Sequence, residues 1–284
     1  MTLCKTFKRR SLSTWNLLSK GRRIGTQLLE ETLTDINLLE LKLSHPSEVI
    51  TTTFTKPKEG TTGADWEWWF TGSSGYWLGF RVQAKIIELQ SSVFEHLHYW
   101  NPKNPFHQSD LLIQSALGTT PGLIPLYCLY ANWDRRNFRS HWSCGSYKQN
   151  VRNYGCSIAS AFAVRRLRSM SGANDLNSLL PYMKPWHCLV CCQGYGNGDL
   201  PHRVWSYWKN QIYSAERAWF GGGNNLPDDA FASLSNLIGL YGDIQPIQSP
   251  PNYIIRILEG RPIEVPDEGL RHITIFREVE NSLI

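Results

Sequence analysis

Two segments decide the fold of this chain: TGADWEWWF at residues 62–70 and GFRVQAKII at residues 79–87. Aromatic and β-branched residues dominate both, which is typical of β-strands. Gly72-Ser73-Ser74-Gly75, between the two segments, is typical of a turn. The sequence therefore predicts two strands that pair as a hairpin.

Polar side chains fall on one face of each predicted strand. Because side chains alternate between the faces of a strand, Asp65, Glu67 and Trp69 should share one side of the first. Gln83 and Lys85 should share one side of the second. In a hairpin, carboxylates, an amide and an ammonium can then converge on one patch, which suits holding a divalent cation against a phosphate.

The bulk composition sets the class of protein. With 284 residues, the chain is long enough for one large domain or two small ones. No run of about 18 apolar residues is present, so we predict no membrane span. The formal charge of +5 favours a polyanionic partner only where basic residues cluster. Seven Cys is an odd count and no secretory leader is recognisable, which predicts reduced thiols in a cytoplasmic protein.

Basic residues do cluster in the first 24 positions. They are Lys5, Lys8, Arg9, Arg10, Lys20, Arg22 and Arg23, with no acidic residue among them. One interpretation is a solvated basic helix that packs through Trp15, and the other is a contact surface for nucleic acid. The composition leaves both open.

Hydrophobic patterning places further elements around the hairpin. We predict a helix at residues 26–43, a strand at 49–55, a helix at 107–117 and a buried strand at 123–130. The order is therefore helix, three strands, helix, strand. For the second half we predict helices at 154–167, 205–220 and 228–241, and strands at 186–192, 253–258 and 272–276. We favour one elaborated domain over two separate ones.

This order resembles the core of the PD-(D/E)XK, or restriction-endonuclease-like, nuclease superfamily. Glu31 (or Glu30) matches the helix carboxylate, Asp65 the strand aspartate, and Gln83-Ala84-Lys85 the (D/E)-x-K element. The Gln form is similar to the Gln-x-Lys variant of Mrr-like restriction enzymes and of several phage-defence effector nucleases. The segments EETLTD, GADWEWW and VQAK also resemble a bacterial family of uncharacterised proteins.

The resemblance implies an α/β fold with an αβββαβ core, in which helices flank a mixed central sheet. It covers residues 26 to 131. The expected organisation is a basic N-terminal segment at 1–25, a nuclease-like core at 26–135 and a helical and strand elaboration at 136–284, packed on the same core.

The resemblance also implies a site for Mg²⁺ (or Mn²⁺), which prefers oxygen ligands and keeps several waters. Asp65 is the first expected ligand, and the side-chain oxygen of Gln83 and the backbone carbonyl of Ala84 can complete the site. Lys85 would orient or deprotonate the attacking water, or stabilise the transition state. Glu31 would bind the metal, hold a metal-bound water or serve a second metal.

Gln83 carries one negative charge less than the carboxylate of the commonest pattern. Glu67 is the expected substitute ligand, although it can equally be a solvent-facing strand residue. Further candidates for supporting or nucleic-acid contacts are Glu30, Gln108, Arg135, Arg136, Lys8, Arg9 and Arg10.

Aromatic and cysteine residues admit two interpretations each. Trp69 and Trp100 can stack on splayed bases, but large aromatic residues more often pack in a core. Cys188 and Cys191 have the spacing of a zinc pair, but their apolar surroundings favour core cysteines.

The sequence thus predicts a metal-dependent endonuclease that acts on DNA in a bacterial cytoplasm, with a role in phage defence that rests on the resemblance. The alternatives are a catalytically inactive nucleic-acid-binding or assembly protein with the same fold, and an RNA nuclease. A homo-oligomer or a regulatory protein partner also stays open.

Overall fold

Helices and strands follow one another along the chain in the predicted order as far as residue 130. The first elements are α1 (Leu3–Ile24), α2 (Glu30–Ser44), β1 (Val49–Thr53), β2 (Trp66–Thr71), β3 (Trp77–Ile86), α3 (Gln108–Leu117) and β4 (Ile124–Tyr130). The later elements are η1 (Val151–Gly155), β5 (Cys156–Ser160), α4 (Ala161–Ser171), α5 (Leu176–Leu179), β6 (Lys184–Pro185), α6 (Cys188–Cys191), α7 (Leu200–Trp208), η2 (Lys209–Tyr213), α8 (Ser214–Phe220), α10 (Asn252–Leu258) and β7 (His272–Arg277).

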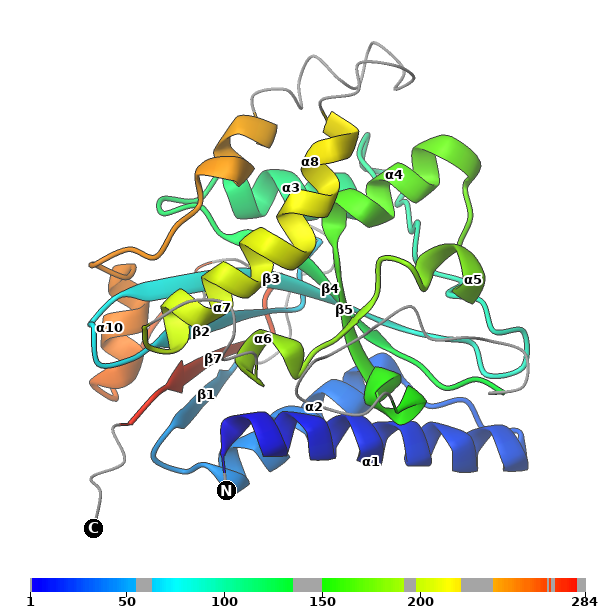
Figure 1. Ribbon diagram of the computed structural model, residues 1–284, viewed down its shortest axis with the longest axis horizontal. Coiled ribbons are helices and arrows are strands. Elements are labelled where there is room, and N and C mark those ends of the chain that lie inside the picture. The colour runs from blue at the N-terminus through cyan, green and yellow to red at the C-terminus, as the bar shows by residue number, and fades with distance from the viewer. Residues whose placement is uncertain are drawn as a thin grey trace.

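The strands form one mixed sheet. The computed structural model describes residues 2–54, 63–134, 150–191, 198–220, 237–264, 266 and 269–279. Across these ranges the sheet has seven strands in the order β1-β7-β2-β3-β4-β5-β6. In Figure 1, α1 and α2 lie along one side of the sheet, and α3 and α4 lie along the other. The predicted α/β class, a mixed sheet flanked by helices, is confirmed.

The predicted hairpin forms the centre of the sheet. Strands β2 and β3 are antiparallel, with Trp66 opposite Val82. Strand β4 runs parallel to β3 and places Tyr127 beside Gln83. Helix α3 makes the crossover between these two parallel strands, which a direct turn cannot do.

The last strand of the chain enters the middle of the sheet. Strand β7 pairs antiparallel with β1 on one side and parallel with β2 on the other. It therefore separates β1 from β2, although these two strands follow each other in the sequence. In the sheet, β1 is connected to β2 only through β7. The C-terminal part of the chain therefore supplies an integral strand of the sheet.

The central strands are buried on both faces because helices cover both. Every residue of β2 and of β4 is buried. Trp68 lies on the α1 side, with its ring centroid 6.4 Å from that of Phe7. Trp69 lies on the opposite side, 6.3 Å from the Tyr253 ring of α10. Trp69 is fully buried, so of its two interpretations the structure supports packing.

Three predictions for the second half are wrong in part or in full. Residues 154–167 contain strand β5 before helix α4, because the run from Cys156 to Ser160 pairs with β4. Residues 253–258 are helix α10: their β-branched content predicts a strand, but Ile254 and Ile257 are spaced for one helical face and pack beside Trp69. Of the predicted strand at residues 186–192, the described residues 186–191 contain the short helix α6, and residue 192 lies outside the described part.

Two cysteines are paired, which corrects the prediction of reduced thiols for them. Cys4 of α1 and Cys191 of α6 form a disulfide, so the sulfur of Cys191 is not free for a zinc pair with Cys188. In the described part of the chain, Cys128, Cys156 and Cys188 are buried thiols outside this disulfide, as expected of core cysteines. No helix among the described residues has both the length and the apolar character that a membrane crossing requires.

Candidate functional site

Asp65 lies directly before β2 and is bound by the neighbouring strand. Its Oδ2 accepts hydrogen bonds from the backbone nitrogen of Ala84 at 2.7 Å and from Nε2 of Gln83 at 2.6 Å. Removal from water raises the pKa of Asp65 to about 7, and the positive charge of Lys85 opposes this shift. The site thus holds a carboxylate that is costly to ionise without an additional cation.

Lys85 faces this carboxylate from the end of β3. Its side chain is 6% exposed, and its Nζ lies 3.9 Å from Oε1 of Glu30 in α2. Burial raises the pKa of Glu30 as well, and Lys85 again opposes the shift. One ammonium therefore serves two carboxylates in a poorly solvated place. The charge of Lys85 lowers the pKa of both acids but less than burial raises it.

Glu30 and Glu31 take different places although they are neighbours in sequence. Glu31 is 62% exposed at its side chain and pairs with Arg271 at 2.7 Å. Adjacent residues of a helix point about 100° apart, so one of the two faces the sheet end and the other the solvent. The structure brings Glu30, and not the preferred Glu31, to Lys85.

A small recess lies beside Asp65, and we call it the Asp65 recess. Glu30, Glu31, Asp65, Ala84, Arg271 and His272 are among its lining residues. The backbone nitrogen of Arg271 donates to the carbonyl oxygen of Asp65 at 2.7 Å, which fixes the start of β7 against the site. Sequence analysis missed Arg271 because it lies about 200 positions after Asp65 and carries no motif.

Two residues extend the site away from the recess. Gln108, at the start of α3, donates from Nε2 to Oε1 of Gln83 at 3.0 Å, as its predicted supporting role requires. Tyr127 lies beside Gln83 in the sheet. Within the described residues, Oε1 of Gln108 and the hydroxyl of Tyr127 are buried without a hydrogen-bond partner. Buried polar atoms are normally satisfied, so both point to a water or ligand at this position.

Tyr127 was not predicted as a site residue. It stands in the apolar run of β4, where an aromatic residue is expected in a core. The parallel pairing of β3 and β4 is what brings it to Gln83, and no local signal in the sequence contains that pairing.

A buried ion-pair cluster fixes the beginning of α3. Asp110 accepts from Nε of Arg165 at 2.9 Å and pairs with Nη2 of Arg168 at 2.9 Å. Arg168 also donates to Ser109 at 2.8 Å. Because these bonds tie α3 to α4, they hold Gln108, the first residue of α3, in place.

Glu67 is not part of the Asp65 site, which corrects the prediction of a substitute metal ligand. Its carboxylate is fully buried and accepts from Nε of Arg81 at 3.1 Å. It also accepts from the indole nitrogen of Trp69 at 3.0 Å and from the Tyr253 hydroxyl at 2.7 Å. With three donors, this carboxylate ties β2, β3 and α10 together.

The predicted basic contacts are partly engaged elsewhere. Arg10 donates to Asn37 at 3.1 Å and lies 3.5 Å from the carboxylate of Glu40. Arg9 donates to Ser44 at 2.8 Å. These bonds join α1 to α2, whereas Lys8 is partly exposed on α1. Arg135 and Arg136 lie outside the described residues.

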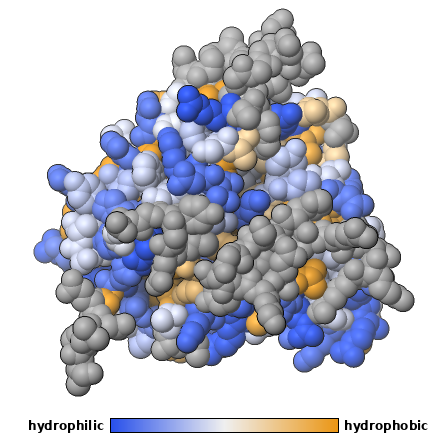
Figure 2. Space-filling model, viewed as in Figure 1, coloured by the Kyte–Doolittle hydropathy of each residue, from blue (hydrophilic) through white to orange (hydrophobic). Residues whose placement is uncertain are grey.

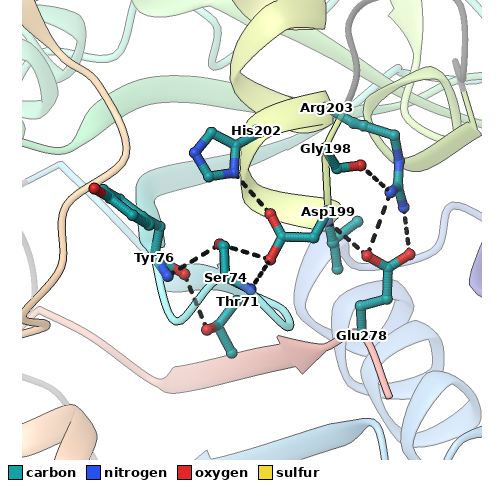
Figure 3. Close-up of polar contacts among 9 residues, drawn as sticks. Thr71, Ser74, Tyr76, Gly198, Asp199, His202, Arg203 and Glu278 are labelled. Atoms are coloured by element: carbon teal, nitrogen blue, oxygen red, sulfur yellow. Dashed lines mark hydrogen bonds and ion pairs between the residues drawn. The ribbon is translucent and has the colours of Figure 1, made fainter. Parts of the chain in front are cut away.

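A second polar cluster lies at the β2–β3 turn (Figure 3). Asp199 accepts from the Ser74 hydroxyl at 2.7 Å and from Nδ1 of His202 at 2.7 Å. Although burial opposes it, the hydrogen bonds of His202 and Ser74 lower the pKa of Asp199. The carboxylate, and not the imidazole, contacts the serine hydroxyl, so the cluster does not have the Ser–His contact of a catalytic triad.

The turn cluster is instead a structural clamp. Glu278 accepts from the backbone nitrogen of Leu200 at 2.8 Å and pairs with Arg203 at 2.5 Å. A Cβ at Gly72 would collide with the Asp199 carboxylate, so this position of the turn requires glycine. The cluster ties the hairpin turn and the segment after β7 to the start of α7.

A family model described as "Family of unknown function (DUF6615)" matches residues 3–282. The chain belongs to this family. No curated protein matches it. The match spans both halves of the sheet, so membership applies to the whole fold of this DUF6615 protein, including the C-terminal strand.

We expect Asp65→Asn to stabilise the protein increasingly as pH rises. The pKa of Asp65 is about 7 in the fold against 3.8 ordinarily, so its contribution to stability is full below pH 3.8 and is lost as pH rises through about 7. Asn imitates the neutral form. In EDTA, the melting temperature of Asp65→Asn relative to wild type should therefore rise between pH 4 and 8. A difference that stays flat, as expected for the exposed control Glu259→Gln, would contradict this account.

We expect Arg81→Met to cost about 3–5 kcal/mol of unfolding free energy, because it leaves the Glu67 charge buried without its cation. The double variant Glu67→Gln, Arg81→Met removes that charge and should recover part of the loss. Urea unfolding of the four proteins in the cycle measures the coupling. Equal costs of the single and double variants would show that the pair is not coupled.

Proposed function

We propose that this protein is a metal-dependent phosphodiesterase, an endonuclease that acts on DNA. The observation that carries the proposal is the meeting of Asp65, Lys85 and Glu30 at one end of the β2–β3 hairpin. These side chains come from a helix and two strands. Two carboxylates and an ammonium around a recess are the groups that phosphodiester hydrolysis with a bound cation requires.

The topology supports a restriction-endonuclease-like core. Elements α2, β1, β2, β3, α3 and β4 follow in the order of that core. The β2–β3 pair is antiparallel and the β3–β4 pair is parallel. The placement of β7 between β1 and β2 is an addition to the expected four-stranded arrangement.

The donor set fits Mg²⁺ or Mn²⁺. No group of three or more His, Cys, Asp or Glu in the described residues is arranged to hold a metal ion. Mg²⁺, however, needs only one or two carboxylates with carbonyl oxygens and waters. Asp65 and Glu30 are desolvated acids with raised pKa values, and a cation would compensate both.

The buried Oε1 atom of Gln108, which has no hydrogen-bond partner, also bears on whether the site can hold a metal ion. At present Gln83 presents its nitrogen to Asp65 and its oxygen to Gln108. Turning both amides keeps their mutual hydrogen bond and directs the Gln83 oxygen to the Asp65 side. The Gln83 nitrogen now donates to Asp65 at 2.6 Å and to the Ala84 carbonyl oxygen at 3.1 Å, so the turned amide would place oxygen against oxygen and fits the site only with a cation bound.

Each residue of the site has a role in the proposed reaction. Asp65 and Glu30 would hold the cation, which when bound supplies positive charge to the scissile phosphate. Lys85 would orient or deprotonate the attacking water, or stabilise charge in the transition state. Gln108 would keep the Gln83 amide in position. Arg271, at the rim, can face a substrate phosphate.

The resemblance extends the proposal to phage defence in bacteria. The Cys4–Cys191 disulfide argues against a reducing compartment, because such bonds are rare there. The alternative is an inactive nucleic-acid-binding protein. It is favoured by the orientation of Gln83, whose side-chain nitrogen and not its oxygen faces Asp65.

We expect Lys85→Ala and Asp65→Asn to lower cleavage of plasmid DNA at least about a hundredfold, because each removes a charged group of the reaction. The measurement is a time course with plasmid and, separately, with RNA, in Mg²⁺, Mn²⁺ or EDTA. Lys42→Ala, the same change on the exposed surface of α2, is the matched control.

Undiminished cleavage by Lys85→Ala would refute the proposed mechanism. Binding of nucleic acid without cleavage by wild type would support the inactive alternative. Preference for the RNA substrate would replace DNA in the proposal.

We expect Mg²⁺ to raise the melting temperature of wild type and not that of Asp65→Asn. A ligand that binds only the folded state stabilises it in proportion to RT ln(1 + [L]/Kd). At a concentration a hundred times Kd, the gain is about 2.7 kcal/mol. Equal shifts of both proteins would place the metal elsewhere.

A further inference from the structure

Exposed aromatic residues gather on one loop that leads into the site. Tyr99, Trp100 and Phe106 are 47%, 48% and 43% exposed. They are the aromatic members among the exposed large hydrophobic residues of the described chain. The other exposed apolar residues are not aromatic, and most of them, such as Leu43 and Met170, lie on helices. We call residues 99–106 the aromatic loop.

Among the residues whose exposure the structure describes, no other Trp, Tyr or Phe is exposed. In Figure 2, hydrophilic residues cover most of the described part of the visible face, and the apolar patches are small. Single exposed aliphatic residues are normal on a protein surface. Three exposed rings within eight positions call for a specific explanation.

The aromatic loop is braced in its own conformation. The indole nitrogen of Trp100 donates to the carbonyl oxygen of Asn104 at 2.8 Å. The Asn104 side chain accepts from the backbone of Phe106 at 3.0 Å. Pro102 and Pro105 further restrict the backbone. Because the loop is already ordered, a ligand that stacks on it pays little for ordering it.

The aromatic loop is also joined to the proposed active site. The carbonyl oxygen of Tyr99 accepts from the backbone nitrogen of Gln108 at 2.9 Å. Trp100 pairs with His107 as an isolated bridge, and their rings lie 6.1 Å apart. Gln108 in turn donates to Gln83, which contacts Asp65. Two hydrogen-bonded residues, Gln108 and Gln83, therefore connect the aromatic loop to the proposed metal ligand Asp65.

We propose that the aromatic loop is a stacking platform for unpaired bases, so that the protein engages single-stranded nucleic acid beside its active site. The inference rests on the proposed function and narrows its substrate. Exposed rings are the groups on which bases of any sequence stack. In a duplex these base faces are occupied by neighbouring base pairs, so the loop discriminates in favour of single strands or frayed ends.

The charges around the loop fit the same ligand. Lys103, between Trp100 and Phe106, is exposed and can contact a phosphate, while Glu95 lies outside the loop. With a single cation on the loop, the rings and not the charges dominate the interaction. The contribution of each ring should therefore vary little with salt, unlike phosphate contacts.

The test measures binding in EDTA, so that it stands apart from metal-dependent cleavage. Fluorescence anisotropy compares a 5′-labelled oligothymidylate with a duplex of the same length. We expect Trp100→Ala to weaken single-strand binding about tenfold, at low and high salt alike. Trp100→Phe should retain most of the affinity, and duplex binding should not change.

Leu43→Ala, which removes an exposed aliphatic residue on α2, is the control and should bind as wild type. Tyr99→Ala serves as a second ring variant, with thermal unfolding as the check on folding. Unchanged single-strand affinity in both ring variants would overturn the proposal. So would sedimentation showing that Trp100→Ala dissociates an oligomer, because the loop would then be a protein interface. If wild type binds single strands in a ring-dependent way but cleaves neither substrate with Mg²⁺ or Mn²⁺, the nuclease mechanism is refuted and the stacking platform stands.

Discussion

The contact between the Asp65 carboxylate and the backbone of β3 is the constraint around which the site is arranged. The carboxylate accepts a main-chain hydrogen bond from Ala84, and the backbone nitrogen of Asp65 donates to Val82 at 2.9 Å, so β3 holds both the side chain and the backbone of Asp65. Its position, and its distance from water, are fixed by the strands and not by a flexible side chain. Its raised pKa is the electrostatic result. Lys85 and Glu30 are then held around it by their own elements.

The same hairpin carries two polar centres with opposite properties. At Glu67, one buried carboxylate meets Arg81 and two neutral donors, so its charge is compensated within the protein. At Asp65, the positive charges of Lys85 and Arg271 do not offset burial, and the pKa values of Asp65 and of neighbouring Glu30 both stay raised. A structural ion pair needs full compensation, whereas a ligand site is incomplete until the ligand arrives. This difference is why we assign function to Asp65 and structure to Glu67.

The C-terminal half supports the site, although no motif in its sequence indicates this role. Strand β7 brings Arg271 against Asp65, and α4 supplies the arginines that fix Asp110 at the start of α3. The clamp at Asp199 holds the opposite end of the hairpin. Both ends of β2 and β3 are thus restrained by segments from later in the chain, consistent with a family match across residues 3–282.

By itself, the sequence determined the elements whose signals are local. Alternation and composition fixed the hairpin, its turn, α2, α3 and β4, and with them the approach of Asp65, Gln83 and Lys85. Only the tertiary structure decided what depends on pairing between distant segments. It inserted β7 beside β2, turned Ile254 and Ile257 into one face of a helix, and brought Tyr127 and Arg271 to the site. It also placed Glu30, and not Glu31, next to Lys85. Packing of α2 against the sheet sets the rotation of the helix about its axis, and two adjacent Glu residues do not reveal that rotation.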